Sequence, residues 1–244
     1  MTPIRRCAAL GALCASLAAP AAGQEWHGQF TLYGWFPTIE GEQERKDGRP
    51  RVQIDAKDIL EALDFAFMGA GEIRRDQIGF LFDVDYARLS SSGETGDRIP
   101  ISASIKTTVA FATAAAAWRF YERDRRFFET YSGIRAYNTE ADFETSIGRF
   151  SRGVSASARW VDPIVGLRAF VPVTERFSVT AFGDVGGTST DELSWELYGG
   201  LNYAFSDRWA GVLGYRYMSI THDANELSLD INLQGPLLGV TYVF

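Results

Sequence analysis

The chain has 244 residues, a formal net charge of −7 and 14% aromatic residues. The acidic balance argues against a nucleic-acid partner. With only two histidines and two cysteines in the whole chain, we expect no transition-metal site and no cofactor.

The first 23 residues are predicted to be a cleaved signal peptide. Two arginines near the start precede an apolar stretch at 7–19, which is too short to cross a bilayer as a helix. Small residues at 21–23 fit a signal-peptidase site, so we expect residues 24–244 to form the mature, single domain. Both cysteines lie in the predicted signal peptide, which would leave the mature domain without thiol chemistry.

Ten segments after the signal peptide show strand-like alternation of apolar and polar residues. Most are longer than the strands of soluble sandwiches, and their lengths suit tilted membrane strands, which need roughly 9–11 residues. The segments are approximately 26–39, 64–74, 77–90, 101–121, 126–140, 157–171, 176–187, 192–205, 208–221 and 227–244.

The connections between these segments alternate between short and long. Short polar turns are expected at 75–76, 122–125, 172–175 and 206–207, and longer connections at 41–63, 91–100, 141–156, 188–191 and 222–226. Short periplasmic turns alternating with longer outer loops are typical of outer-membrane barrels. We therefore predict an all-β, closed, antiparallel up-and-down transmembrane β-barrel of ten strands, with eight or twelve strands as the alternatives. A short helix is expected in the first outer loop, at residues 55–63.

Residues 192–205 show how the two faces of a strand are expected to divide. Leu193, Leu197 and Leu201 share one face, and Ser194 and Glu196 share the other. In a membrane barrel the apolar face contacts lipid and the polar face lines the lumen.

The last segment carries a pattern typical of the C-terminal signal by which bacterial barrels are recognised for insertion. Leu238, Val240, Tyr242 and the terminal Phe244 alternate on one face. The apolar residues upstream of them have the opposite parity, so we expect a β-bulge near 234–236, where glycine and proline occur.

Charged residues gather on the expected lumen face. Matched charges would form an ion-paired interior that fills a narrow barrel; the alternative is a polar path or a ligand site. The predicted lumen charges are Glu72, Asp83, Asp85, Glu129, Arg135, Asp162, Arg168, Asp184, Glu196 and Arg216.

His222 is the candidate for catalysis. It lies at an outer strand end with Asp223 beside it and Ser219 nearby, so it could act as a general base in a rim hydrolase. Adjacent acidic and histidine side chains are common on surface loops, and we predict that the protein is not an enzyme, with no catalytic, cofactor-binding or metal residues.

Several sequence blocks resemble a family of uncharacterised Gram-negative outer-membrane β-barrel proteins. More distantly, the pattern is similar to small barrels of the OmpA and OmpW type. The resemblance implies the barrel fold and no particular biochemical activity. The blocks are Leu63–Ala70 with Glu72 and Arg74, Trp160–Arg168, Gly183–Gly187, Leu213–Tyr217 and Gly235–Gly239.

The expected function is that of a structural component of the cell outer membrane, or of a narrow passive channel with a charged, largely filled lumen. The alternative is a binder of a small molecule or lipid that uses the outer loops 41–63 and 141–156. Expected partners are outer-membrane lipid, lipopolysaccharide and, during insertion, the barrel assembly machinery. We expect a monomer.

Overall fold

The computed structural model describes residues 26–42, 51–95, 101–147, 150–189, 192–224 and 227–244. The predicted signal peptide at 1–23 lies outside them. The described residues form one helix and twelve strands. Their bounds are β1 His27–Trp35, β2 Thr38–Glu42, β3 Arg51–Ile54, α1 Ala56–Ala62, β4 Leu63–Arg75, β5 Ile78–Thr95, β6 Ile101–Arg123, β7 Arg126–Ile147, β8 Phe150–Pro172, β9 Phe177–Ser189, β10 Glu192–Ala204, β11 Trp209–Ala224 and β12 Leu227–Val243.

Ten of these strands close into an antiparallel barrel, as the sequence predicts. The order is β1 followed by β4 to β12, with each strand hydrogen-bonded to the next in this order. β12 returns to β1 and pairs with it from Gln29↔Val243 to Trp35↔Leu237. This pairing closes the barrel, so no free sheet edge remains along the β1–β12 ladder. A free sheet edge would not be tolerated in hydrocarbon.

β2 and β3 are two additional short strands that come from the region expected to be the first outer loop. β2 pairs with β12 from Thr38↔Gln234 to Glu42↔Asp230, in the same register that β1 uses further along β12. β1 and β2 therefore act as one strand interrupted at Phe36 and Pro37, where proline cannot donate to the ladder. β3 folds back onto β2.

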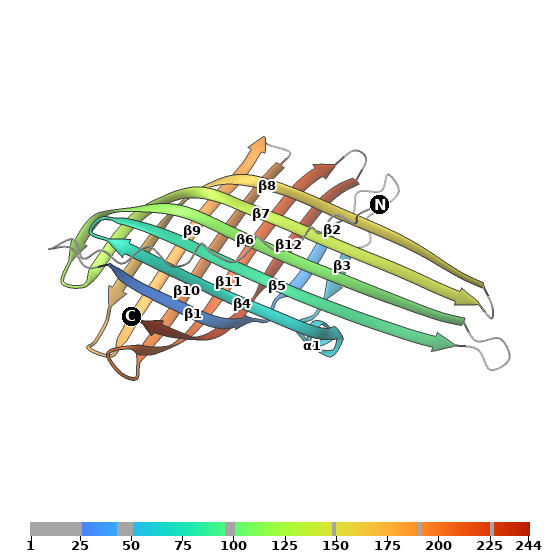
Figure 1. Ribbon diagram of the computed structural model, residues 1–244, viewed down its shortest axis with the longest axis horizontal. Helices are drawn as coiled ribbons and strands as arrows, with labels where there is room; N and C mark the ends of the chain where they lie inside the picture. The colour runs from blue at the N-terminus through green and yellow to red at the C-terminus, as the bar shows by residue number, and fades with distance from the viewer. Residues whose placement is uncertain (1–25, 43–50, 96–100, 148–149, 190–191, 225–226) are drawn as a thin grey trace, which may run out of the picture.

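The two ends of the barrel differ in their connections (Figure 1). At one end, here called the turn end, β4–β5, β6–β7, β8–β9 and β10–β11 are joined by short turns, and the C-terminus lies at this end. Asp124 and Arg125 both have positive φ, 52° and 65°, as a two-residue turn between twisted strands requires. At the opposite end, the loop end, β5 to β8 extend furthest.

The helix predicted in the first outer loop is present as α1. Asp55 precedes it in an extended conformation and makes no side-chain capping bond. None of its residues is buried. Among the described residues, no helix combines the length and apolar character needed to cross a membrane.

The strand faces divide as predicted in β10. Leu193, Leu197 and Leu201 are exposed on the outside of the barrel, whereas Ser194 and Glu196 are 1% exposed on the inside. The outer surface of the barrel is therefore a largely apolar wall.

The predicted bulge near 234–236 is wrong. β12 keeps one register against β11 from Trp209↔Tyr242 to Ala224↔Leu227. Leu233 and Leu237 are 7% and 6% exposed and face the barrel interior. β12 needs no change of face, because the loop-side half of the barrel interior is itself apolar.

Candidate functional site: the filled barrel interior

The charged residues inside the barrel form two separate clusters. The first, near the turn end, is here called the turn-side cluster. The second lies deeper, and is called the mid-barrel cluster. The turn-side cluster consists of Glu72, Arg74, Arg119, Glu129 and Arg168, and the mid-barrel cluster of Asp83, Asp85, Arg135, Asp184, Glu196 and Arg216.

The turn-side cluster is centred on Glu129, whose side chain is fully buried. Arg74 Nη2 lies 2.5 Å from Glu129 Oε2, and Arg168 Nη2 lies 2.6 Å from Glu129 Oε1. Arg74 Nε lies 2.5 Å from Glu72 Oε1, and Arg168 also pairs with Glu72. The fifth member, Arg119, approaches Glu129 at 3.5 Å.

The charges of the turn-side cluster balance when its rim is included. Arg119 Nη1 lies 3.1 Å from Glu122 Oε2, which is 57% exposed at the turn end. Three arginines thus face three carboxylates. Buried charges remain stable in a protein only when they are paired and hydrogen-bonded in this way.

Arg216 joins opposite walls in the mid-barrel cluster. From β11, its Nε lies 2.5 Å from Glu196 Oε1 on β10, and its Nη1 lies 2.8 Å from Asp85 Oδ2 on β5. Its guanidinium carbon also lies 4.7 Å from the centre of the Trp35 ring, a cation–π geometry. Arg216 therefore spans the lumen between β11 and β5, which are not neighbours in the sheet.

Arg135 makes a second crossing from β7. Its two terminal nitrogens each donate to Asp184 on β9 at 2.9 Å, a bidentate pairing. Its Nη2 also lies 2.6 Å from Glu196 Oε2. Glu196 thus receives both arginines and links the two crossings.

Tyrosine hydroxyls complete the mid-barrel cluster, which has more carboxylates than arginines. The Tyr33 hydroxyl donates toward Asp83 at 2.6 Å and lies 2.9 Å from Asp85. The Tyr131 hydroxyl donates to Asp184 at 2.8 Å. These hydroxyls add hydrogen bonds to those that the two arginines donate to the same carboxylates.

The structure brings nine of the ten sequence-predicted lumen charges into these two clusters. Asp162 is the exception: it is buried opposite Arg135 in the sheet, and its carboxylate accepts a hydrogen bond from Ser194 at 3.3 Å. The sequence prediction missed Arg74 and Arg119. Their parity gave the signal, because each lies an even number of residues from a lumen-facing position of its own strand.

An apolar layer fills the lumen on the loop side of the mid-barrel cluster. This outer apolar layer was not predicted, because its residues on β12 were assigned to lipid. Its members are buried together in one hydrophobic cluster: Phe111, Tyr137, Met218, Ile220 and Leu233.

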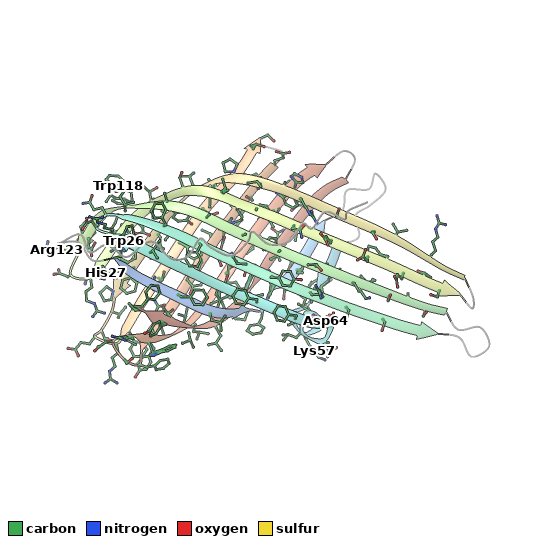
Figure 2. All side chains as sticks on the ribbon, viewed as in Figure 1. Trp26, His27, Lys57, Asp64, Trp118 and Arg123 are labelled. Carbon is green, nitrogen blue, oxygen red and sulfur yellow. The ribbon has the colours of Figure 1, made fainter. Side chains whose placement is uncertain are left out.

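A cavity of about 820 Å³ occupies the turn side of the lumen. Turn residues, among them Arg125, Arg176 and Arg208, line it at one end, and Tyr33 and Arg216 line it at depth. It therefore reaches inward to the mid-barrel cluster. Figure 2 shows the crowding of side chains at this end, where Trp26, Trp118 and Arg123 lie, and α1 with Lys57 toward the loop end.

The ring of His222 packs against aromatic residues and is not paired with Ser219, one of the two partners proposed for catalysis. The ring stacks on Trp160, with centroids 4.3 Å apart and planes at 9°, and Trp160 stacks in turn on Tyr137 at 4.6 Å. Ser219 lies three residues away on the same strand, so the two side chains leave opposite faces. The side chain of Asp223 lies outside the described ones.

The predicted insertion-signal residues lie on the outside of the turn end. Leu238, Val240 and Phe244 are 61%, 44% and 64% exposed, and Tyr242 packs against Trp209 with ring centroids 4.8 Å apart. The Phe244 amide donates to the Gly28 carbonyl at 2.9 Å, which ties the last residue to β1. Their role in recognition stays a prediction.

Within the described part of the chain, no group of three or more histidine, cysteine, aspartate or glutamate side chains is arranged to hold a metal ion. The buried carboxylates of the mid-barrel cluster instead accept hydrogen bonds and ion pairs from guanidinium groups and tyrosine hydroxyls.

A closed antiparallel barrel with an apolar outside and a charged inside defines the class of transmembrane β-barrels. The chain is similar in structure to the outer membrane protease OmpT from Escherichia coli, with a TM-score of 0.61, 10% identity, and coverage of 92% of this chain and 99% of OmpT. It also matches the translocator domain of the autotransporter NalP from Neisseria meningitidis at a TM-score of 0.46 and 12% identity, covering 91% and 89% of the two chains. No family model and no curated protein sequence matches the chain. The first likeness shows the fold alone, and the resemblance to an uncharacterised barrel family stays a prediction.

Proposed function

We propose that the protein is an outer-membrane β-barrel with an occluded lumen, and that it serves as a structural membrane component and not as a passive channel. One observation carries the proposal: Arg216 and Arg135 cross the lumen and bind carboxylates on β5, β9 and β10. The outer apolar layer adds a second obstacle on the loop side. An ion would have to break buried ion pairs and then cross an apolar layer, and both steps are costly.

The membrane placement is supported by the outer wall. Large apolar side chains are exposed along it, including Leu167 at 62%, Leu213 at 58% and Leu238 at 61%. An isolated soluble barrel would expose them to water, whereas a bilayer would cover them. The same proposal includes export through the signal peptide, a monomeric state, and contacts with lipopolysaccharide and the barrel assembly machinery.

Planar-bilayer recording tests the occlusion. We expect the refolded protein to give no discrete conductance steps in potassium chloride, because ion-paired and apolar layers block the lumen. Heat-modifiable migration on gels, measured on protein recovered from the vesicles that deliver it to the planar bilayer, would show that folded barrels were inserted. Discrete steps whose frequency grows with the amount of inserted wild-type protein would contradict the proposal.

A paired variant sharpens the same experiment. Glu196→Ser combined with Arg216→Ser shortens both sides of one crossing and removes one positive and one negative charge, so the net charge of the mid-barrel cluster is unchanged. We expect it to increase ion leakage from loaded vesicles. Leu197→Ala, on the outward face of β10 and 54% exposed, is the matched control and should leave the vesicles tight. Equal leakage for the two variants would argue that Arg216 does not block the lumen.

A further inference from the structure

The barrel wall is split between β1 and the loop-side part of β4. The two strands pair only from His27↔Arg74 to Leu32↔Gly69. β4 begins six residues earlier, at Leu63, and β1 continues to Trp35. In the split, the Trp35 amide donates to the Met68 sulfur at 3.2 Å, a weak acceptor in place of a ladder carbonyl.

An apolar cavity of about 240 Å³ lies at this split, beneath α1, which contacts β2 and β5. Trp35, which faces inward, and Phe36, the next residue on the opposite face, both line it. The cavity therefore reaches the edge of β1 where pairing with β4 has stopped. Its apolar lining includes Ile59 and Leu60 of α1, Met68 of β4, Phe111 of β6 and Leu233 of β12.

One residue of the cavity lining, Trp35, carries an unsatisfied buried polar atom. Trp35 is 4% exposed, and its indole Nε1 is buried without a hydrogen-bond partner among the described residues. A buried donor of this kind is stabilised by any ligand that brings an acceptor. Asp85 also lines the cavity, with its carboxylate paired to Arg216 at 2.8 Å. An anionic head group would lie beside that carboxylate, so the acceptor should be neutral.

The outside of the barrel next to the split carries an aromatic band. Phe65 and Phe67 on β4 are 57% and 45% exposed, and Phe65 lies 6.0 Å from the Tyr86 ring on β5. Bands of this kind mark the interface between hydrocarbon and water in membrane barrels. An opening at this level faces the region on the loop side where lipid chains join their head groups.

We propose that this cavity binds a single-chain, neutral amphiphile of the fatty-alcohol class, which enters through the split between β1 and β4. The hydrocarbon chain occupies the apolar lining, and the hydroxyl oxygen accepts a hydrogen bond from Trp35 Nε1. The cavity volume of about 240 Å³ lies just below the range for drug-sized ligands, which begins at about 300 Å³. It therefore suits a smaller ligand with a single hydrocarbon chain. The site borders the mid-barrel cluster through Asp85, but the proposal does not depend on whether the lumen conducts.

Indole ¹⁵N–¹H spectra of the protein in phospholipid nanodiscs test the proposal. The chain has six tryptophans, and Trp35→Phe assigns the Trp35 signal by its loss. We expect 1-decanol to cause a saturable downfield proton shift of the Trp35 signal, while decane, which has no acceptor, causes no such downfield shift. If the Trp35 signal does not respond to 1-decanol, or if all tryptophan signals drift together without saturation, the proposal is wrong.

A cavity-filling variant separates binding from partition into the bilayer. Ala87→Phe places a ring in the lining, since Ala87 borders the cavity on the inner face of β5. Ala112→Phe adds the same ring on the outer, exposed face of β6. We expect at least a tenfold loss of apparent affinity for 1-decanol with Ala87→Phe and no change with Ala112→Phe. Heat-modifiable migration on gels checks that both variants are folded. An unchanged titration in Ala87→Phe would overturn the assignment.

Discussion

Replacing Arg216 with methionine should lower the free energy of unfolding by about 3–5 kcal/mol, the cost of removing one partner from a buried ion pair. Methionine keeps much of the side-chain volume, so the loss comes from the charge and its hydrogen bonds. Asp85 would remain buried without its guanidinium partner, and Glu196 would keep only Arg135. Urea titration of the protein in lipid vesicles, followed by tryptophan fluorescence and by gel migration before and after boiling, measures the change.

Arg159→Met is the matched control for this prediction. Arg159 pairs with Glu140 near the loop end, but its side chain is 70% exposed. An exposed pair contributes about 0–1 kcal/mol, so this variant should unfold close to the wild-type midpoint. Equal destabilisation by the two variants would contradict the account of Arg216 as a buried crossing.

Replacing Glu129 with alanine should cost a similar amount, about 3–5 kcal/mol. The fully buried Glu129 separates Arg74 and Arg168, and its loss leaves these two cations facing each other with Glu72 as the remaining buried acceptor. The same urea titration measures the effect.

A second substitution separates charge from shape at this position. Glu129→Gln keeps the volume and one acceptor oxygen, so we expect a smaller loss than with alanine. Glu140→Ala, which removes a half-exposed carboxylate from an exposed pair, should change stability by less than about 1 kcal/mol. If Glu129→Ala were as mild as Glu140→Ala, the turn-side cluster would not stabilise the barrel.

The strands were predictable because one physical pattern determines them. In a membrane barrel, lipid outside and polar groups inside impose a period of two along each strand, and Leu193 to Leu201 with Ser194 and Glu196 follow it. The short turns added the second constraint, since their alternation with long connections fixes an antiparallel order. Together these patterns predicted ten barrel strands closed by the last one.

The pairing inside the lumen could not be predicted from single strands. Which charges meet depends on the tilt and stagger of strands around the closed barrel. Arg216 contacts Asp85 across the lumen, 131 residues away in the chain. Parity identified both residues as lumen-facing but could not identify them as partners.

The outer apolar layer is where sequence reasoning was wrong. Ile231 and Leu233 alternate like lipid-facing residues, and assigning them to lipid required a bulge at 234–236. The structure instead turns them inward against Met218 and Ile220. When hydrophobic side chains fill a lumen, apolar alternation alone does not reveal whether the apolar face of a strand contacts lipid or the lumen.

The most direct test of the central claim, a barrel that spans the outer membrane with its short turns in the periplasm, is cysteine labelling in intact cells. Both natural cysteines, Cys7 and Cys14, lie in the predicted signal peptide, so single cysteines can be placed at Asp58 in α1 and at Asp207 in the β10–β11 turn, both exposed. We expect a maleimide coupled to a polymer too large for porins to label Asp58→Cys in intact cells, and to label Asp207→Cys only after the outer membrane is permeabilised. Labelling of Asp207→Cys in intact cells, or protection of Asp58→Cys, would contradict the central claim.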